Sequence, residues 1–169
     1  HDQGPAKQGG VKVGDVLLSI NGHELDDVQN LRFRIATLSV GAVAKVGIMR
    51  RGGKVVLDMV LAAPPEIPKR FETVLQGHHP FAGARVANLS PALADKLGLP
   101  HAWTGVIILD LNRTGNAARL GFEVGDIIRK INGDPVTDVR TLTAMVQDPR
   151  SGWLIVMERG GHEMKLVVR

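Results

Sequence analysis

The sequence contains an internal repeat, and this feature limits the possible folds more than any other. Residues 4–35 align without a gap on residues 115–146, at an offset of 111 residues, and 12 of the 32 aligned pairs are identical. The shared motifs are Gly14-Asp15 and Asn21-Gly22 in the first copy, and Gly125-Asp126 and Asn132-Gly133 in the second. Two copies so far apart indicate two small domains rather than a solenoid of short repeats.

A second pair of motifs extends the repeat towards the end of each copy. Arg51-Gly52-Gly53 aligns with Arg159-Gly160-Gly161 at an offset of 108, so the first copy should have three extra residues before this turn. Each motif lies between two runs of alternating apolar residues, which predicts a β-hairpin with glycine at positive φ. The hairpin strands are expected at Ala44–Met49 with Val55–Leu61 and at Leu154–Glu158 with Glu163–Val168.

The composition excludes several classes of function. Cysteine is absent from the 169 residues, which excludes disulfides, thiolate catalysis and Cys-ligated metals. The net charge of +4 comes from interspersed charges, and aromatic residues make up only 4 %, so we expect no nucleic-acid partner. No apolar run approaches the roughly 20 residues that span a bilayer, so no membrane span is expected in this chain.

A proline-rich stretch separates the two copies. Pro64, Pro65 and Pro68 favour an extended, semi-rigid backbone. We therefore expect a first domain at residues 1–63, a linker at 64–79 and a second domain at 80–169. Both domains should be of the α+β class.

The pattern of each copy also predicts its strands and helices. Strands are expected at Val16–Ile20, Ala84–Leu89, Gly105–Leu111 and Ile127–Ile131, and a short helix at Pro91–Leu97 with Ser90 as N-cap. A longer helix should follow each Asn-Gly turn. In the first copy Asp26 or Asp27 caps it, and in the second copy Thr137 or Asp138. The buried faces of these helices are expected to be Val28, Leu31, Ile35 and Leu38, and Val139, Leu142, Thr143 and Val146.

The run from Asn112 to Ile128, followed by Ile131-Asn132-Gly133, resembles the PDZ domains of bacterial HtrA/Deg serine proteases. The segment from Asn88 to Pro100 is similar to the region after the first strand of such a domain. The resemblance implies two PDZ-like domains, each a small, mostly antiparallel, partly open β-barrel with two helices.

The first copy departs from this family pattern. Only three residues precede Gly4, whereas about 35 precede Gly115 from Pro80 onwards. The carboxylate-binding loop and the groove-edge strand of the first domain should therefore be absent, and we expect the chain to be part of a longer protein. Whether the remainder folds normally or borrows a strand from another molecule stays open.

The resemblance also implies a peptide-binding site in the second domain. It comprises a carboxylate-binding loop, a strand that pairs with the peptide and one face of a helix. These correspond to Phe81, Ala82, Gly83 and Ala84, then Arg85 and Val86, then Leu142, Thr143 and Val146. Inward-facing backbone N–H groups would hold the terminal carboxylate, and the peptide would add a strand beside residues 84–87. Alternatively, Phe81, Leu142 and Val146 simply pack in the core, and the groove is closed.

No catalytic or metal site is expected in this chain. None of the four serines lies in a Gly-x-Ser-x-Gly or Gly-Asn-Ser-Gly-Gly motif; they are Ser19, Ser39, Ser90 and Ser151. His78 and His79 are adjacent, so in a strand they would point to opposite faces and not chelate one ion. We expect no cofactor.

The sequence therefore predicts a protein-recognition module of an HtrA/Deg-type periplasmic serine protease, with the catalytic domain upstream. Its expected partners are C-termini or unfolded segments of misfolded substrates, the protease domain and further copies of the chain. One alternative is a structural module that builds oligomers and has a closed groove. Another is a regulatory PDZ pair of a membrane-embedded protease or a secretion protein.

Overall fold

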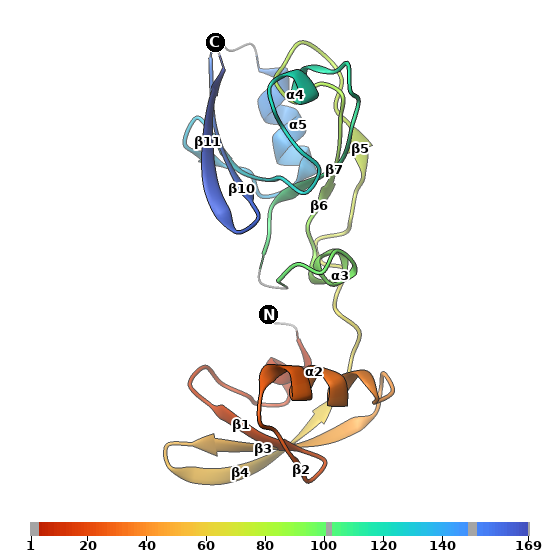
Figure 1. The fold of residues 1–169 in the computed structure, drawn as a ribbon, viewed down its shortest axis with the longest axis vertical. Coiled ribbons are helices and arrows are strands. Elements are labelled where there is room, and N and C mark those ends of the chain that lie inside the picture. The colour runs from red at the N-terminus through yellow and green to blue at the C-terminus, as the bar shows by residue number, and fades with distance from the viewer. Residues whose placement is uncertain (1–3, 101–102, 149–151, 169) are drawn as a thin grey trace. The chain divides into compact units, whose positions relative to one another are not determined.

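The computed structural model describes residues 4–100, 103–148 and 152–168, so Ser151 lies outside the described residues. The chain divides into two compact units, His1–Pro65 and Glu66–Arg169. Both units combine short helices with antiparallel sheets (Figure 1). The expected α+β class is therefore confirmed.

The first unit contains one four-stranded antiparallel sheet with the order β2-β1-β3-β4. Its elements are α1 (Pro5–Gln8), β1 (Val16–Ile20), β2 (His23–Glu24), α2 (Val28–Ala36), β3 (Val43–Arg50) and β4 (Gly53–Val60). The core of the unit is small and is formed by six buried residues: Ile20, Ala44, Val46, Ile48, Met59 and Leu61.

The second unit contains a seven-stranded antiparallel sheet with the order β11-β10-β8-β7-β6-β5, and β9 pairs with β8. Its elements are β5 (Thr73–Val74), β6 (Ala84–Asn88), α3 (Pro91–Lys96), β7 (Val106–Leu111), α4 (Asn116–Arg119), β8 (Ile127–Ile131), β9 (Asp134–Pro135), α5 (Val139–Gln147), β10 (Trp153–Arg159) and β11 (His162–Val168). The predicted caps form, since Ser90 accepts from Leu93 N at 3.2 Å and Asp138 from Thr141 N at 2.7 Å.

The repeat is visible in the structure as pairs of equivalent elements. Each of α1, β1, β2 and α2 has an equivalent element 111 residues later, in α4, β8, β9 and α5. The hairpin register corrects the expected alignment of the turns. Arg50 pairs with Gly53, and Arg159 with His162, so the offset there is 109 and the first copy has two extra residues, not three. Arg51 adopts φ 49° where the second copy has Gly160 at φ 56°.

Each Gly-Asp motif is completed by an arginine from the hairpin. Asp15 accepts from Lys12 N at 2.7 Å and from Arg50 Nε at 2.8 Å. Asp126 accepts in the same way from Glu123 N at 2.8 Å and from Arg159 Nε at 2.6 Å. The aspartates therefore accept hydrogen bonds from the local backbone and also link the turn to the hairpin.

The predicted buried face of α2 is only partly buried. Val28 is 64 % exposed and Ile35 is 38 % exposed, whereas Leu31 and Leu38 pack against the core. In the second unit, Leu142 of α5 is fully buried and α5 contacts β6. Residues 4–65, as described, contain no counterpart of β6, so the matching face of α2 lacks its cover.

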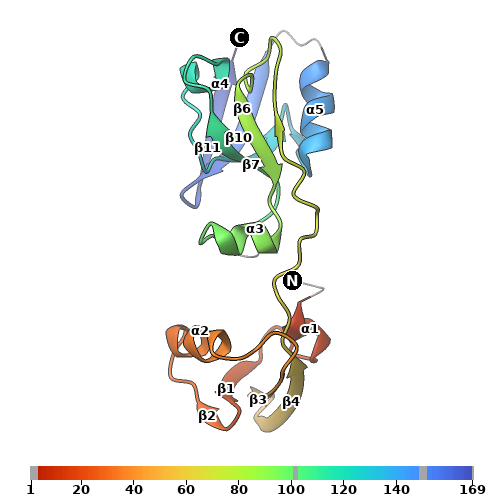
Figure 2. The same ribbon diagram turned by 90° about the vertical axis from the view of Figure 1, so that its right-hand side faces the viewer.

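The stretch predicted as a linker, residues 64–79, differs from that expectation in its second half. Thr73–Val74 forms β5, which pairs with β6, and Leu75 is 3 % exposed in the core. The physical reason is that the Leu75 side chain packs in the apolar core, while the backbone of the neighbouring residues forms hydrogen bonds with β6. Figure 2 shows the yellow-green segment with β5 running between β6 and α5.

Candidate binding groove

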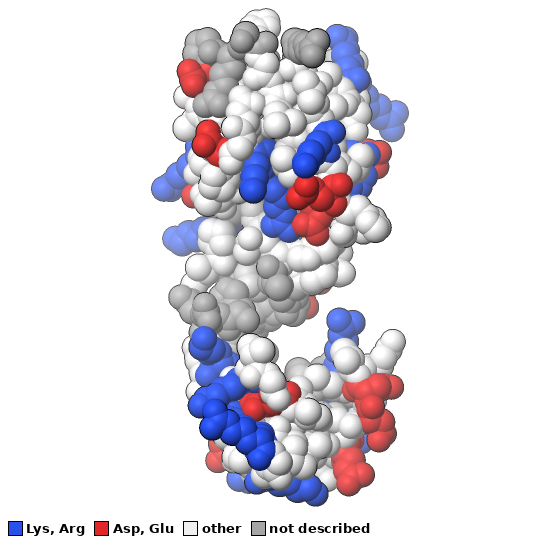
Figure 3. Space-filling model, turned by 90° about the vertical axis from the view of Figure 1, so that its left-hand side faces the viewer, with Lys and Arg blue, Asp and Glu red and all other residues white. Residues whose placement is uncertain are grey.

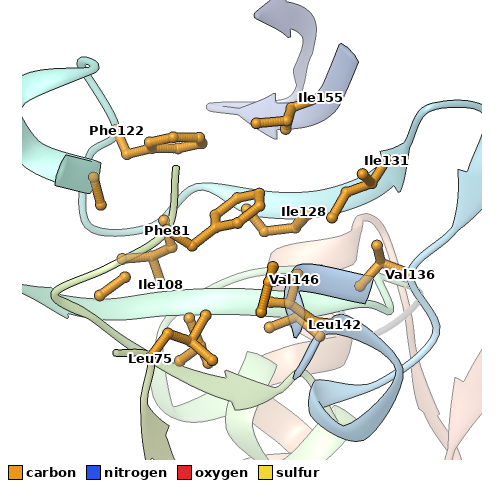
Figure 4. Close-up of a cluster of buried hydrophobic side chains, with 14 of the residues drawn as sticks. Leu75, Phe81, Ile108, Phe122, Ile128, Ile131, Val136, Leu142, Val146 and Ile155 are labelled. Carbon is orange, nitrogen blue, oxygen red and sulfur yellow. The ribbon is translucent and has the colours of Figure 1, made fainter. Parts of the chain in front are cut away.

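The predicted loop, residues 81–84, connects the β5 region to β6. Phe81 is fully buried, and its ring lies 5.1 Å from that of Phe122, measured between centroids. Figure 4 shows Phe81 among the same apolar side chains as Leu75, Leu142 and Val146. The loop therefore has its aromatic residue anchored in the core.

All four backbone N–H groups of this loop already have acceptors within the chain. Phe81 N donates to His79 Nδ1 at 3.2 Å, and Ala82 N to the carbonyl of His79 at 3.1 Å. Gly83 N donates to the Leu75 carbonyl at 2.8 Å, and Ala84 N to the Phe81 carbonyl at 3.0 Å. A peptide carboxylate would have to displace at least one of these acceptors.

The strand predicted to pair with a peptide has neighbours on both sides. On one side β6 pairs with β7, and on the other β5 pairs antiparallel, with Thr73 opposite Val86 and Val74 opposite Arg85. Val86 is fully buried, whereas Arg85 reaches outward and lies 3.2 Å from Glu72. The edge of β6 that a peptide would occupy is therefore covered by the chain itself.

Helix α5 supplies the opposite wall. Asp138 caps α5, and the hydrogen bond from Thr141 N, the largest cause, lowers the pKa of Asp138. Leu142 is fully buried and Val146 is 9 % exposed, both in the cluster that holds Leu75. Thr143 is partly buried, and its hydroxyl donates to the Val139 carbonyl at 2.8 Å. The structure thus brings together Phe81, Ala84 and Val86 from the loop and strand with Leu142 and Val146 from the helix.

A pocket of about 700 Å³ lies between residues 73–79 and the C-terminal end of α5. Thr143, Val146 and Gln147 of α5 line it, together with Trp153. The space between the segment of residues 73–79 and α5 is therefore accessible from outside.

Three residues that the sequence analysis did not assign to the site organise it. Leu75 fills the groove, and Asn88 holds the chain on either side: its Nδ2 donates to the Lys69 carbonyl at 2.7 Å, and its Oδ1 accepts from Val139 N at 2.7 Å. The third is His79. Thr73 and Val74 are residue types common in strands, but a run of two is too short to separate from the linker by its sequence.

His79 is nearly buried and holds the loop through both ring nitrogens. Nδ1 accepts from Phe81 N, so Nε2 carries the proton and donates to the Gln76 carbonyl at 3.1 Å. Burial lowers the pKa of His79, and the hydrogen bond to Gln76 offsets this only in part. The neutral ring therefore matches the geometry of the loop.

On the face of the second unit that Figure 3 shows, one group of blue and red side chains lies together, while other blue side chains stand apart from it. Arg129 pairs with Glu158, and Arg159 with Glu123 at 2.6 Å. Among the described residues, no cluster of three or more His, Asp or Glu side chains could hold a metal ion. In the same part of the chain, every helix is too short or too polar to cross a membrane.

Comparison with known proteins identifies both the domain and its relatives. Residues 1–61 match the family model described as PDZ domain. The chain is 25 % identical over 164 residues to the periplasmic serine endoprotease DegP of Salmonella typhimurium, covering 97 % of this chain and 32 % of that protein. It is 30 % identical over 151 residues to a probable DegP-like periplasmic serine endoprotease of Pseudomonas putida, covering 87 % of this chain and 31 % of that protein.

A solved structure, the HtrA3 PDZ domain bound to a phage-derived ligand (FGRWV), is 23 % identical and aligns with a TM-score of 0.45. That alignment covers 58 % of this chain and 84 % of the other. The chain spans about a third of the length of the curated relatives. The family model thus identifies a PDZ domain at residues 1–61, and the curated relatives show that most of the chain is homologous to periplasmic serine proteases of the DegP/HtrA type.

Proposed function

We propose that this chain is the protein-recognition region of a periplasmic serine endoprotease. In this proposal the second unit binds extended segments of misfolded substrates along β6, opposite α5. Proteolysis belongs to a catalytic domain outside this chain. Homology to the DegP-type relatives supports the periplasmic location and the link to proteolysis.

One observation carries the proposal: the edge of β6 accepts an antiparallel strand in this structure. Leu75 N donates to the Ala84 carbonyl at 2.9 Å, and Gly83 N donates back to the Leu75 carbonyl. Strand addition of this kind derives affinity from the main chain and specificity from side-chain pockets. The apolar pocket that receives Leu75 would supply that specificity.

The hydrogen bonds of the loop favour internal segments over C-termini as ligands. Of the loop amides, only Gly83 N donates to the strand beside β6, while the other three donate to His79 or Phe81. A C-terminal carboxylate would therefore gain a single loop donor unless His79 moved. We expect a peptide amide to bind about as well as the free acid.

The test is a fluorescence anisotropy titration of the full chain with a labelled, aliphatic-ended peptide, as free acid and as amide. Affinity should be modest, on the order of micromolar, because ordering the peptide opposes its backbone hydrogen bonds. Thr143→Arg should weaken binding, since this side chain lines the pocket, whereas Ala144→Arg, on the exposed side of α5, should not. If the free acid binds tenfold or more tightly, the loop is a carboxylate site after all.

A second candidate function is a structural module that builds oligomers. It is favoured by the complete pairing of the four loop amides within the chain. No binding of either peptide at millimolar concentration, together with self-association in sedimentation, would support this function instead.

A further inference from the structure

We infer that residues 73–75 are an internal ligand of the second unit, which an external segment must displace before it can bind. This inference rests on the proposed function of the β6–α5 groove. It adds that the groove is regulated by the chain itself, and that the internal segment defines the ligand: an extended stretch with an aliphatic residue at the position of Leu75.

The side chains of the internal segment alternate as those of a bound strand would. Leu75 is 3 % exposed and packs in the cluster of Phe81, Leu142 and Val146, whereas Val74 is 50 % exposed. A strand places successive side chains on opposite faces, so Leu75 is the anchor and Val74 faces outward. The groove therefore selects for an aliphatic side chain at one defined position.

The backbone of the internal segment is bonded to the groove at both ends. At its C-terminal end, the Leu75 amide and carbonyl pair with Ala84 and Gly83. Near its N-terminal end, Asn88 N donates to the Arg70 carbonyl at 2.8 Å, and Asn88 Nδ2 donates to Lys69. The segment therefore forms the backbone hydrogen bonds that an added peptide strand would form with β6.

Two features of the internal segment favour its local opening. The paired strand is only two residues long, and Phe71, just before it, adopts φ 41°, a region that side-chain-bearing residues rarely occupy. The Phe71 ring is 49 % exposed and lies beneath the Arg140 guanidinium of α5, at 5.4 Å. A short paired stretch and a strained residue are typical of segments that open locally.

An attached competitor lowers the apparent affinity of an external ligand by the fraction of time the groove is free. Changing the competitor should therefore change binding without touching the external contacts. The probe is a labelled, acetylated and amidated peptide with the sequence of residues 70–76, titrated against the full chain.

An engineered disulfide that holds the internal segment on β6, and that can be reduced again, gives the most direct test. Leu75 N donates to the Ala84 carbonyl, and the Leu75 carbonyl accepts from Gly83 N. The next pair along the strands, Val74 and Arg85, therefore lies at a non-hydrogen-bonded position, where Cα atoms are about 4.5 Å apart. This separation suits a disulfide. The chain has no cysteine of its own, so Val74→Cys with Arg85→Cys forms the sole crosslink.

We expect the oxidised double variant to bind the probe about tenfold more weakly, or worse, than the same protein after reduction. Leu75→Ala should bind it about tenfold more tightly than wild type, since the competitor loses its anchor. Leu154→Ala, at an exposed leucine of β10, is the matched control and should leave binding unchanged.

The outcomes separate this inference from the proposed function. Equal binding by the oxidised and reduced forms, with crosslinking verified by mass spectrometry, overturns the internal ligand and leaves peptide recognition standing. If Leu75→Ala keeps a cooperative unfolding transition, exchanges its Gly83 amide rapidly and still binds no probe, then the proposed function fails and the inference fails with it.

Discussion

The buried ion pair between Asp126 and Arg159 offers the most direct test of how the second unit is held together. The Asp126 side chain is fully buried, and it accepts from Arg159 Nε and Nη2 at 2.6 and 2.7 Å. Asp126→Asn keeps the shape and an acceptor for Glu123 N, but it removes the charge and turns an amide NH₂ towards the guanidinium. We expect a large loss of stability confined to this unit.

The magnitude follows from burial and from the partners that remain. Breaking a buried ion pair typically costs about 3–5 kcal/mol. Arg159 is 26 % exposed on its side chain and retains Glu123 at 2.6 Å and the Gly121 carbonyl at 2.8 Å. The loss should therefore lie at or below the lower end, about 2–3 kcal/mol. For a unit of this size, that corresponds to a fall in Tm of about 10–20 °C.

Intrinsic fluorescence measures this unit alone, because both tryptophans of the chain, Trp103 and Trp153, lie in it. The assay is guanidinium unfolding detected by tryptophan emission. Asp15→Asn changes the equivalent motif in the first unit and is the matched control, expected to leave this transition unchanged. A double-mutant cycle with Arg159→Met isolates the pair. A coupling energy below about 0.5 kcal/mol would refute the reasoning.

Three further predictions concern pH and capping. Hydrogen bonds from Arg50 lower the pKa of Asp15 from 3.8 to about 2, so the first unit should lose stability as the pH falls through this interval, and Asp15→Asn should flatten the loss in circular-dichroism melts. Burial lowers the pKa of His79 from 6.5, so the second unit should lose stability below about pH 6.5, where the unfolded chain binds the proton more readily; His79→Gln should reduce this loss in tryptophan-detected unfolding. Asp138→Ala removes the N-cap of α5 and should cost about 1 kcal/mol in the same assay.

The sequence alone was sufficient for the local elements and for the repeat. The strand at Val16–Ile20, the strand at Ile127–Ile131 and the caps at Ser90 and Asp138 all occur where the pattern predicts them. These features depend on residues close in sequence: apolar periodicity, a side-chain oxygen before a helix, and Asn-Gly at a turn. The three-dimensional arrangement therefore changes them little.

Burial on the helices was harder to predict, because a helix face is buried only if something covers it. The same apolar spacing occurs in α2 and α5, yet Val28 is exposed while its counterpart Val139 is fully buried. The difference lies in β6, which is distant in sequence and has no counterpart among the described residues of the first unit.

Only the tertiary structure determines that residues 73–75 form a strand beside β6 and that Leu75 is buried. Proline content close by indicated a linker, and a strand of two residues has no periodicity to detect. Leu75 docks because Phe81, Leu142 and Val146, from separate elements, form an apolar pocket beside an unpaired stretch of β6. Burial of one side chain and the pairing of backbone groups then outweigh local preference, and neither can be evaluated before the fold has brought these elements together.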